Sequence, residues 1–69
     1  MRRKRVESSA IRSVGYDARR AILEIEFTSG IVYQYDKFPQ SLHEKFMRAD
    51  SKGRFFREHI LDQFSVARA

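Results

Sequence analysis

The sequence predicts an α+β fold, in which a three-stranded antiparallel β-meander is followed by two short α-helices packed on one face. Two observations predict it. Strand-like runs of β-prone and alternating residues cluster in the first half of the chain, and helix-like apolar stripes with spacings of three and four residues follow in the second. The 69 residues leave room for one hydrophobic core and no second domain. Because three strands need a cover to be stable, we expect both helices to pack on the sheet.

Turn-forming residues divide the first half into three expected strands. The first strand is expected over residues 10–16, which are rich in β-branched side chains, and a turn over 17–20 follows it. Residues 21–27 show the clearest alternation in the chain. The polar connection 28–30 ends in a glycine and leads to a third β-prone run over 31–35, so these two strands are expected to form a hairpin.

The second strand separates apolar from acidic side chains. Leu23, Ile25 and Phe27 share one face, while Glu24 and Glu26 share the other. Two neighbouring carboxylates can serve acid–base chemistry, but no nucleophile with a matching base accompanies them here. We therefore expect the glutamates to lie on a solvated outer face.

Two helices are expected after the strands. Pro39 favours the first helical position, so a helix is expected over residues 39–49. A second helix is expected over 53–64, with an N-cap from Asp50 or Ser51. The apolar stripes of these helices are Leu42, Phe46 and Ala49, then Phe56, Ile60 and Phe64.

The positive charge of the chain is unevenly distributed. The net charge is +5, and the four consecutive cations from Arg2 to Arg5 account for most of it. Residues 1–7 have too little apolar surface to order themselves, so they are expected to be a flexible basic arm. The single domain is expected over 8–64 and a frayed tail over 65–69. A second excess of basic side chains lies between Lys37 and Arg57.

Composition argues against several classes of protein. There is no cysteine, which removes disulfides and thiolate metal sites and fits a cytoplasmic protein. No apolar run approaches the ~20 residues of a membrane span, so no membrane association is expected. His43 and His59 lie sixteen residues apart, without ligands at metal-binding spacing. We expect no enzyme activity, cofactor or metal.

Several short motifs follow one another along the chain, and their order is more specific than any one of them. They are Ser8-Ser9, Gly15-Tyr16-Asp17, Gly30, Tyr33-Gln34-Tyr35, Pro39, and Ala49-Asp50-Ser51-Lys52-Gly53 followed by Phe56 and Ile60. In this order they resemble the KTSC family, a short domain named after the C-terminal extension of some lysyl-tRNA synthetases and also found as a stand-alone bacterial or phage protein. The resemblance extends from about residue 6 to residue 64.

The resemblance implies an unassigned biochemical role, for which RNA binding has been suggested from the synthetase context. It implies no catalytic residues. The Tyr-x-Tyr motif corresponds to Tyr33 and Tyr35, and the Ser-Lys-Gly motif to residues 51–53. The family pattern leads us to expect a small polar residue after the second aromatic, where this chain has Arg57.

Each candidate site has a functional and a structural interpretation. Tyr33 and Tyr35 could form a platform on which bases stack, or a buried stripe that packs on the first helix with its hydroxyls at the rim. Ser51, Lys52 and Gly53 begin a helix, where backbone amides and cations could bind an anion. They could equally form a corner between two helices, with a side-chain cap and a glycine that permits close packing.

The function that we expect is a small non-catalytic binding domain for nucleic acid, with RNA as the partner. Lys45, Arg48, Lys52, Arg54 and Arg57 are expected to contact phosphate, assisted by the basic arm. The alternative is a protein-interaction module, or a homodimer, that docks through aromatic and charged side chains. We expect a monomer or a weak homodimer.

Overall fold

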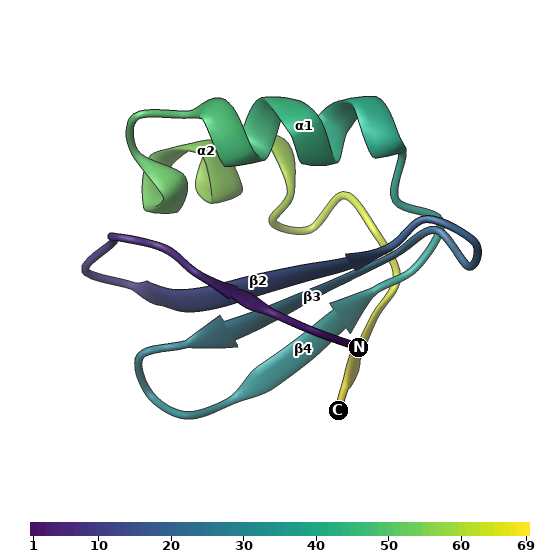
Figure 1. The fold of residues 1–69 in the computed structure, drawn as a ribbon, viewed down its shortest axis with the longest axis horizontal. Helices are drawn as coiled ribbons and strands as arrows, with labels where there is room; N and C mark the ends of the chain where they lie inside the picture. The colour runs from purple at the N-terminus through teal and green to yellow at the C-terminus, as the bar shows by residue number, and fades with distance from the viewer.

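The computed structural model describes residues 1–69 as an antiparallel sheet covered on one face by two helices (Figure 1). The five strands lie side by side in sequence order. The elements are β1 (Lys4–Arg5), β2 (Ile11–Asp17), β3 (Ile22–Phe27), β4 (Val32–Tyr35), α1 (Gln40–Arg48), α2 (Lys52–His59) and β5 (Val66–Arg68). This arrangement confirms the α+β class and the central meander.

Local polar contacts close the two turns of the meander. The Asp17 carboxylate accepts from the backbone N–H groups of Arg19 and Arg20 at 3.1 and 3.3 Å, which shapes the turn between β2 and β3. The turn between β3 and β4 places Gly30 at φ 95°, a conformation that glycine adopts without steric cost. Its N–H donates to the Phe27 carbonyl at 2.9 Å. Both turns therefore follow from residues that the sequence marks as turn formers.

The expected strand count of three is wrong, because both ends of the chain add a strand. Lys4 pairs with Val14 in β1–β2, and Val66 pairs with Tyr35 in β4–β5. The segments expected as an arm and a frayed tail thus contribute the two edges of the sheet. Backbone hydrogen bonding places them there, and segments this short carry no alternation from which pairing could be predicted.

Gly15 provides the space in which the N-terminal segment lies. A Cβ on Gly15 would sit 2.9 Å from the Arg2 carbonyl oxygen and 3.0 Å from the Arg3 Cγ. Side chains longer than hydrogen would therefore push residues 1–3 away from the sheet. The requirement for glycine comes from this close approach and not from an unusual backbone conformation.

The helices follow the expected order, but the second is shorter than expected. It runs from Lys52 to His59, whereas the sequence pattern predicts helix to residue 64. The helix ends with Ile60 as its C-cap, and Asp62 then adopts the left-handed conformation at φ 62° where the chain turns back toward the sheet. The Asp36 N–H then donates to the Ser65 carbonyl at 2.9 Å and starts the pairing of β5.

The hydrophobic core lies between the sheet and the helices. Eight buried residues form it: Ile11, Val14, Leu23, Ile25, Tyr35, Phe38, Phe46 and Ile60. Phe46 and Ile60 come from the expected helical stripes, while Leu42, Phe56 and Phe64 are only partly buried. Phe38 lies in the connection before Pro39 and is fully buried as well. Neither helix is long or apolar enough to cross a membrane.

Candidate nucleic-acid interface

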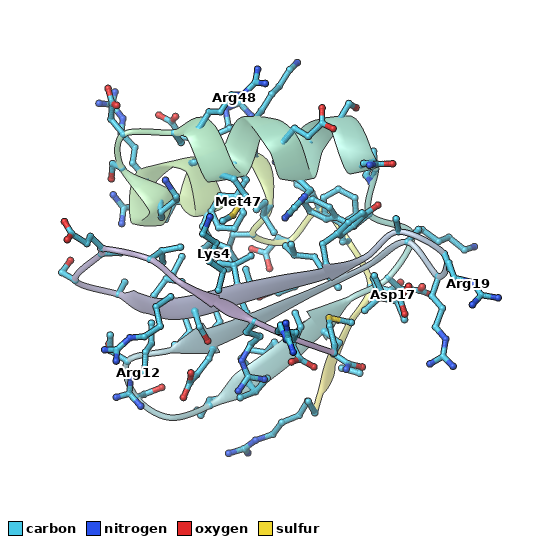
Figure 2. The ribbon with its side chains drawn as sticks, viewed as in Figure 1. Lys4, Arg12, Asp17, Arg19, Met47 and Arg48 are labelled. Carbon is cyan, nitrogen blue, oxygen red and sulfur yellow. The ribbon has the colours of Figure 1, made fainter.

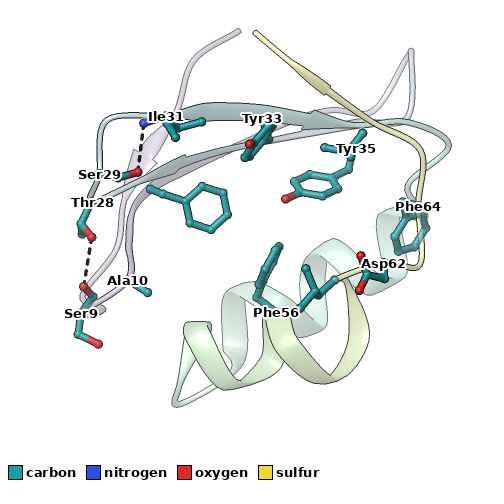
Figure 3. A pocket seen from close by; sticks show the side chains of 13 residues that line it. Ser9, Ala10, Thr28, Ser29, Ile31, Tyr33, Tyr35, Phe56, Asp62 and Phe64 are labelled. Carbon is teal, nitrogen blue, oxygen red and sulfur yellow. Dashed lines mark hydrogen bonds between the residues drawn. The ribbon is translucent and has the colours of Figure 1, made fainter.

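An open groove with aromatic walls lies between the helix-facing side of the sheet and α2 (Figure 3). Its volume is about 670 Å³. Aromatic and aliphatic side chains make most of its lining, and a few polar side chains stand at its ends. We call it the aromatic groove, lined by Ser9, Ala10, Phe27, Thr28, Ser29, Ile31, Tyr33, Tyr35, Phe56, Leu61, Asp62, Phe64 and Val66.

The two tyrosines of the Tyr-x-Tyr motif lie on the same face of β4 but differ in burial. The Tyr35 ring is buried, with 5% of the residue exposed, and meets the Phe56 ring edge-on at 5.9 Å. Tyr33 is half-buried and packs edge-on against Phe27 at 6.0 Å. Tyr35 therefore fits the interpretation as a buried stripe. Its aromatic partner, Phe56, lies on α2, whereas the sequence predicts packing on the first helix. Tyr33 keeps part of its surface open to the groove.

The Tyr35 hydroxyl has no hydrogen-bond partner in the chain, although its ring is buried. Burial, together with the neighbouring Tyr33, raises the pKa of Tyr35 to about 12. The hydroxyl therefore stays protonated at neutral pH and can donate a hydrogen bond into the groove.

The Ser-Lys-Gly motif forms the corner between α1 and α2. The Ser51 hydroxyl accepts from the Arg54 N–H at 3.2 Å and caps α2. The Lys52 ammonium donates to the Ala49 carbonyl at 2.6 Å, at the end of α1. Gly53 makes no close approach, because an added Cβ would find its nearest neighbours 3.8 Å away. Ser51 and Lys52 are thus used by the corner, and the expected close packing at Gly53 is absent.

The remaining predicted phosphate contacts are exposed on the two helices. Lys45 and Arg48 stand on α1 without carboxylate partners, and Arg48 points away from the sheet (Figure 2). Arg54 pairs with Glu58 at 3.3 Å, and both side chains are largely exposed. Arg57 has no ion pair. These cations are therefore available to a ligand, whereas the tyrosines face the groove beneath the helices.

Glu24 and Glu26 do not lie on a solvated face, which corrects the expectation from sequence. The Glu24 side chain is 8% exposed and accepts from Arg3 at 2.5 Å and from Gln34 at 2.8 Å. Glu26 accepts from the Ser13 hydroxyl at 2.8 Å. The N-terminal segment, expected to be mobile, supplies the arginine that covers these carboxylates.

This network sets the acidity of both carboxyl groups. Burial alone would raise the pKa of Glu24, but hydrogen bonds from Gln34 and Arg3, with the charge of Arg3, bring it below its usual value. For Glu26, the Ser13 hydrogen bond outweighs the effect of burial and, with the charge of Arg12, lowers the pKa. Both groups are therefore ionised and paired at neutral pH, which suits structural carboxylates.

The histidines lie in aromatic surroundings. The His43 ring stacks on Tyr16 at 4.6 Å, and burial lowers the pKa of His43 despite the nearby Glu44. His59 packs on Phe55 at 4.6 Å. No group of three or more His, Cys, Asp or Glu side chains in the chain could hold a metal ion.

Two charged residues beside the aromatic groove are absent from the sequence-based site. Asp62 lines one end of the groove (Figure 3). Arg68 pairs with Tyr33 across β4 and β5, so both side chains project to one face of the sheet. The chain reversal after α2 places both, and no local pattern in the sequence signals that reversal.

A family model described as the KTSC domain matches residues 7–64. The chain belongs to the KTSC domain family. The match begins at residue 7, after β1, and ends at residue 64, before β5. The KTSC domain thus includes the meander, both helices and the corner, while both edge strands fall outside the matched range.

Relatives and a solved structure agree with this assignment. An uncharacterized protein of Stutzerimonas stutzeri is 43% identical over 58 residues, which cover 84% of this chain and 82% of that protein. A lysine–tRNA ligase of Nostoc punctiforme is 41% identical over 58 residues, which make up 84% of this chain but 10% of the ligase. The crystal structure of a KTSC domain protein from Yersinia pestis has a TM-score of 0.97 at 43% identity and covers 99% of this chain and 96% of that one.

Proposed function

We propose that this KTSC domain is a non-catalytic RNA-binding module. The observation that carries the proposal is the set of exposed cations on the helical side of the molecule, where Lys45, Arg48 and Arg57 have no carboxylate partner. Unpaired cations on one side of a small domain attract a polyanion, because each phosphate contact releases condensed counterions.

The other predicted contacts contribute less directly. Arg54 shares its charge with Glu58, but exposed pairs of this kind are weak, so the guanidinium can exchange its partner for phosphate. The Lys52 ammonium uses one of its three donors on Ala49. Ser51 and Gly53 lie beside it as part of the proposed anion-binding segment. We therefore rank Lys45, Arg48 and Arg57 above Lys52 and Arg54.

The occurrence of similar sequences in lysine–tRNA ligases supports RNA as the nucleic acid. In three lysine–tRNA ligases the match covers 10% of each protein, the size of an appended domain. Enzymes of this name act on tRNA, and an appended basic domain would add phosphate contacts to that substrate. The same chemistry in a separate chain would bind RNA on its own.

Charge reversal tests the proposal. The variant that carries Arg48→Glu and Arg57→Glu is compared with one that carries Arg19→Glu and Arg20→Glu, which changes the net charge equally at the β2–β3 turn. Binding of a labelled single-stranded RNA is measured by fluorescence anisotropy over a range of salt concentrations. The helix variant should bind more weakly with a shallower salt dependence, by about 0.7 in log–log slope for each lost contact, while the turn variant should resemble the wild type.

A contrary result would favour the protein-interaction alternative. If the wild type binds no RNA at low salt, or binds it without salt dependence, the proposal fails. A docking surface for another protein would then be sought, since apolar association depends little on salt.

A further inference from the structure

We infer that the aromatic groove holds an unpaired base of the RNA strand, and that it prefers a base with an exocyclic amino group. This inference rests on the proposed function and adds to it a second contact region, the aromatic groove, which lies beside the helix cation Arg57. Three features of the groove support it: its aromatic walls, its polar groups and the charges at its mouth.

The walls of the groove suit a flat ring. Phe27, Tyr33 and Phe56 present partly open aromatic surface, with the Phe27 and Phe56 rings 5.3 Å apart at a steep angle. Phe64 closes one end. The volume of about 670 Å³ exceeds what a base alone requires, so the groove can admit a base together with part of its sugar. Single-stranded RNA modules hold bases on such aromatic surfaces.

The polar groups of the groove favour a ligand that both accepts and donates hydrogen bonds. The buried Tyr35 carries a hydroxyl that is aimed into the groove and has no partner in the chain (Figure 3). The Asp62 carboxylate lines the same groove and forms no ion pair. A ring nitrogen or carbonyl can accept from the tyrosine, and an amino group can donate to the carboxylate. Adenine and cytosine offer both groups on one edge, whereas uracil has no amino group.

Cations stand where the backbone of a bound strand would pass. The Arg57 guanidinium lies beside Gly53, which is also close to Ala10 in the lining of the groove. Arg68 projects to the same face as Tyr33 from the edge strand. A free base would gain nothing from these charges, but a strand would place its phosphates near them. We therefore assign the groove to a base within RNA.

Two conservative variants test the groove. Tyr35→Phe removes the hydroxyl and keeps the ring, and Asp62→Asn removes the charge in a residue type that tolerates the left-handed conformation. Asp50→Asn is the matched control, because Asp50 is exposed and lies outside the groove. Thermal unfolding verifies that each variant is folded. Anisotropy then measures binding of short single-stranded oligomers of adenylate, cytidylate and uridylate.

We expect the wild type to bind the adenylate and cytidylate oligomers several-fold more tightly than the uridylate oligomer. Asp62→Asn should reduce this preference, because the uncharged amide oxygen accepts more weakly than a carboxylate oxygen. Tyr35→Phe should weaken binding of the two amino-bearing oligomers by about three- to tenfold. Asp50→Asn should change neither. Free cytidine should compete with the oligomers only in large excess.

The outcomes separate this inference from the proposed function. If the helix charge-reversal variant loses affinity while Tyr35→Phe, Asp62→Asn and Asp50→Asn all behave as wild type, RNA binding stands and the base site is overturned. Competition by free cytidine at the affinity of the oligomer would overturn the assignment to a strand. If no RNA binds to the wild type at all, the proposed function fails and the base site fails with it.

Discussion

Arg3 reaches across the face of the sheet at Gly15 to donate to Glu24 at 2.5 Å. Gly15 and Glu24 are directly paired between β2 and β3. Because Gly15 has no side chain, Arg3 has room to lie over it and reach Glu24. A basic N-terminal segment thereby becomes the cover for a buried carboxylate. This relationship makes the first residues of the chain part of the folded domain.

Replacing Arg3 with Ala should destabilise the domain by about 1–2 kcal/mol, because Glu24 would keep only Gln34 as a partner in a site that is largely shielded from water. Urea unfolding followed by circular dichroism measures the change. Arg5→Ala is the control, since Arg5 is exposed two residues further along the chain, in β1, and forms no ion pair. Equal stability of the two variants would show that the Arg3 contact contributes nothing.

Two of the three glycines in the sequence motifs, Gly15 and Gly53, should respond to alanine in opposite directions. Gly15→Ala should cost about 1–3 kcal/mol, since its Cβ would meet the backbone of Arg2. Gly53→Ala should stabilise by about 0.5–1 kcal/mol, because it lies within α2 and has space for a methyl group. Thermal melts of both variants measure the difference. A stable Gly15→Ala protein would mean that residues 1–3 are not held against the sheet.

Stability should fall in acid as Glu24 and Glu26 become protonated. Their pKa values are lowered in the folded chain, so the unfolded chain binds more protons around its glutamate pKa of about 4.3. The stabilisation is complete above that pH and is lost as pH falls toward the lower folded values. Urea midpoints compared near neutrality and near pH 3.5 should show the loss, and Glu24→Gln should reduce it. An unchanged acid dependence in Glu24→Gln would place the titrating group elsewhere.

Lys52 should matter more for stability than for RNA. Its ammonium supports the end of α1, so Lys52→Met should destabilise by about 0.5–1 kcal/mol. Arg57→Met should leave stability unchanged and weaken RNA binding more than Lys52→Met does. Chemical unfolding and anisotropy on both variants decide the order. A larger loss of affinity in Lys52→Met, with unchanged stability, would restore the interpretation of this segment as an anion site.

The central meander and the helix order could be predicted because their signals are local. Leu23 and Ile25 alternate with glutamates, and Pro39 precedes an apolar stripe. The two edge strands could not be predicted, because backbone hydrogen bonding places them and segments of two and three residues carry no alternation. Likewise, Glu24 looks solvated until the partner from the distant N-terminus is placed over it.

Only part of the candidate site could be predicted from the sequence. The motif containing Tyr33 and Tyr35 marks one wall of the groove. Burial of the Tyr35 ring, with its hydroxyl still open, is a property of three-dimensional packing. Asp62 lines the groove, and Arg68 pairs with Tyr33, because the chain reverses at a non-glycine residue in the left-handed conformation. No turn motif in the sequence predicts that reversal.

The most direct test of RNA binding is a ¹⁵N–¹H NMR titration of the complete chain with a short single-stranded RNA. The proposed function, with its base site, predicts that amide shifts change along α1 and α2 and around Tyr33, Tyr35 and Asp62, while the outer face around Glu24 stays unchanged. Changes confined to residues 1–5 would contradict it by reducing binding to a non-specific attraction to the N-terminal cations. A spectrum without changes at low salt would show that the domain does not bind RNA.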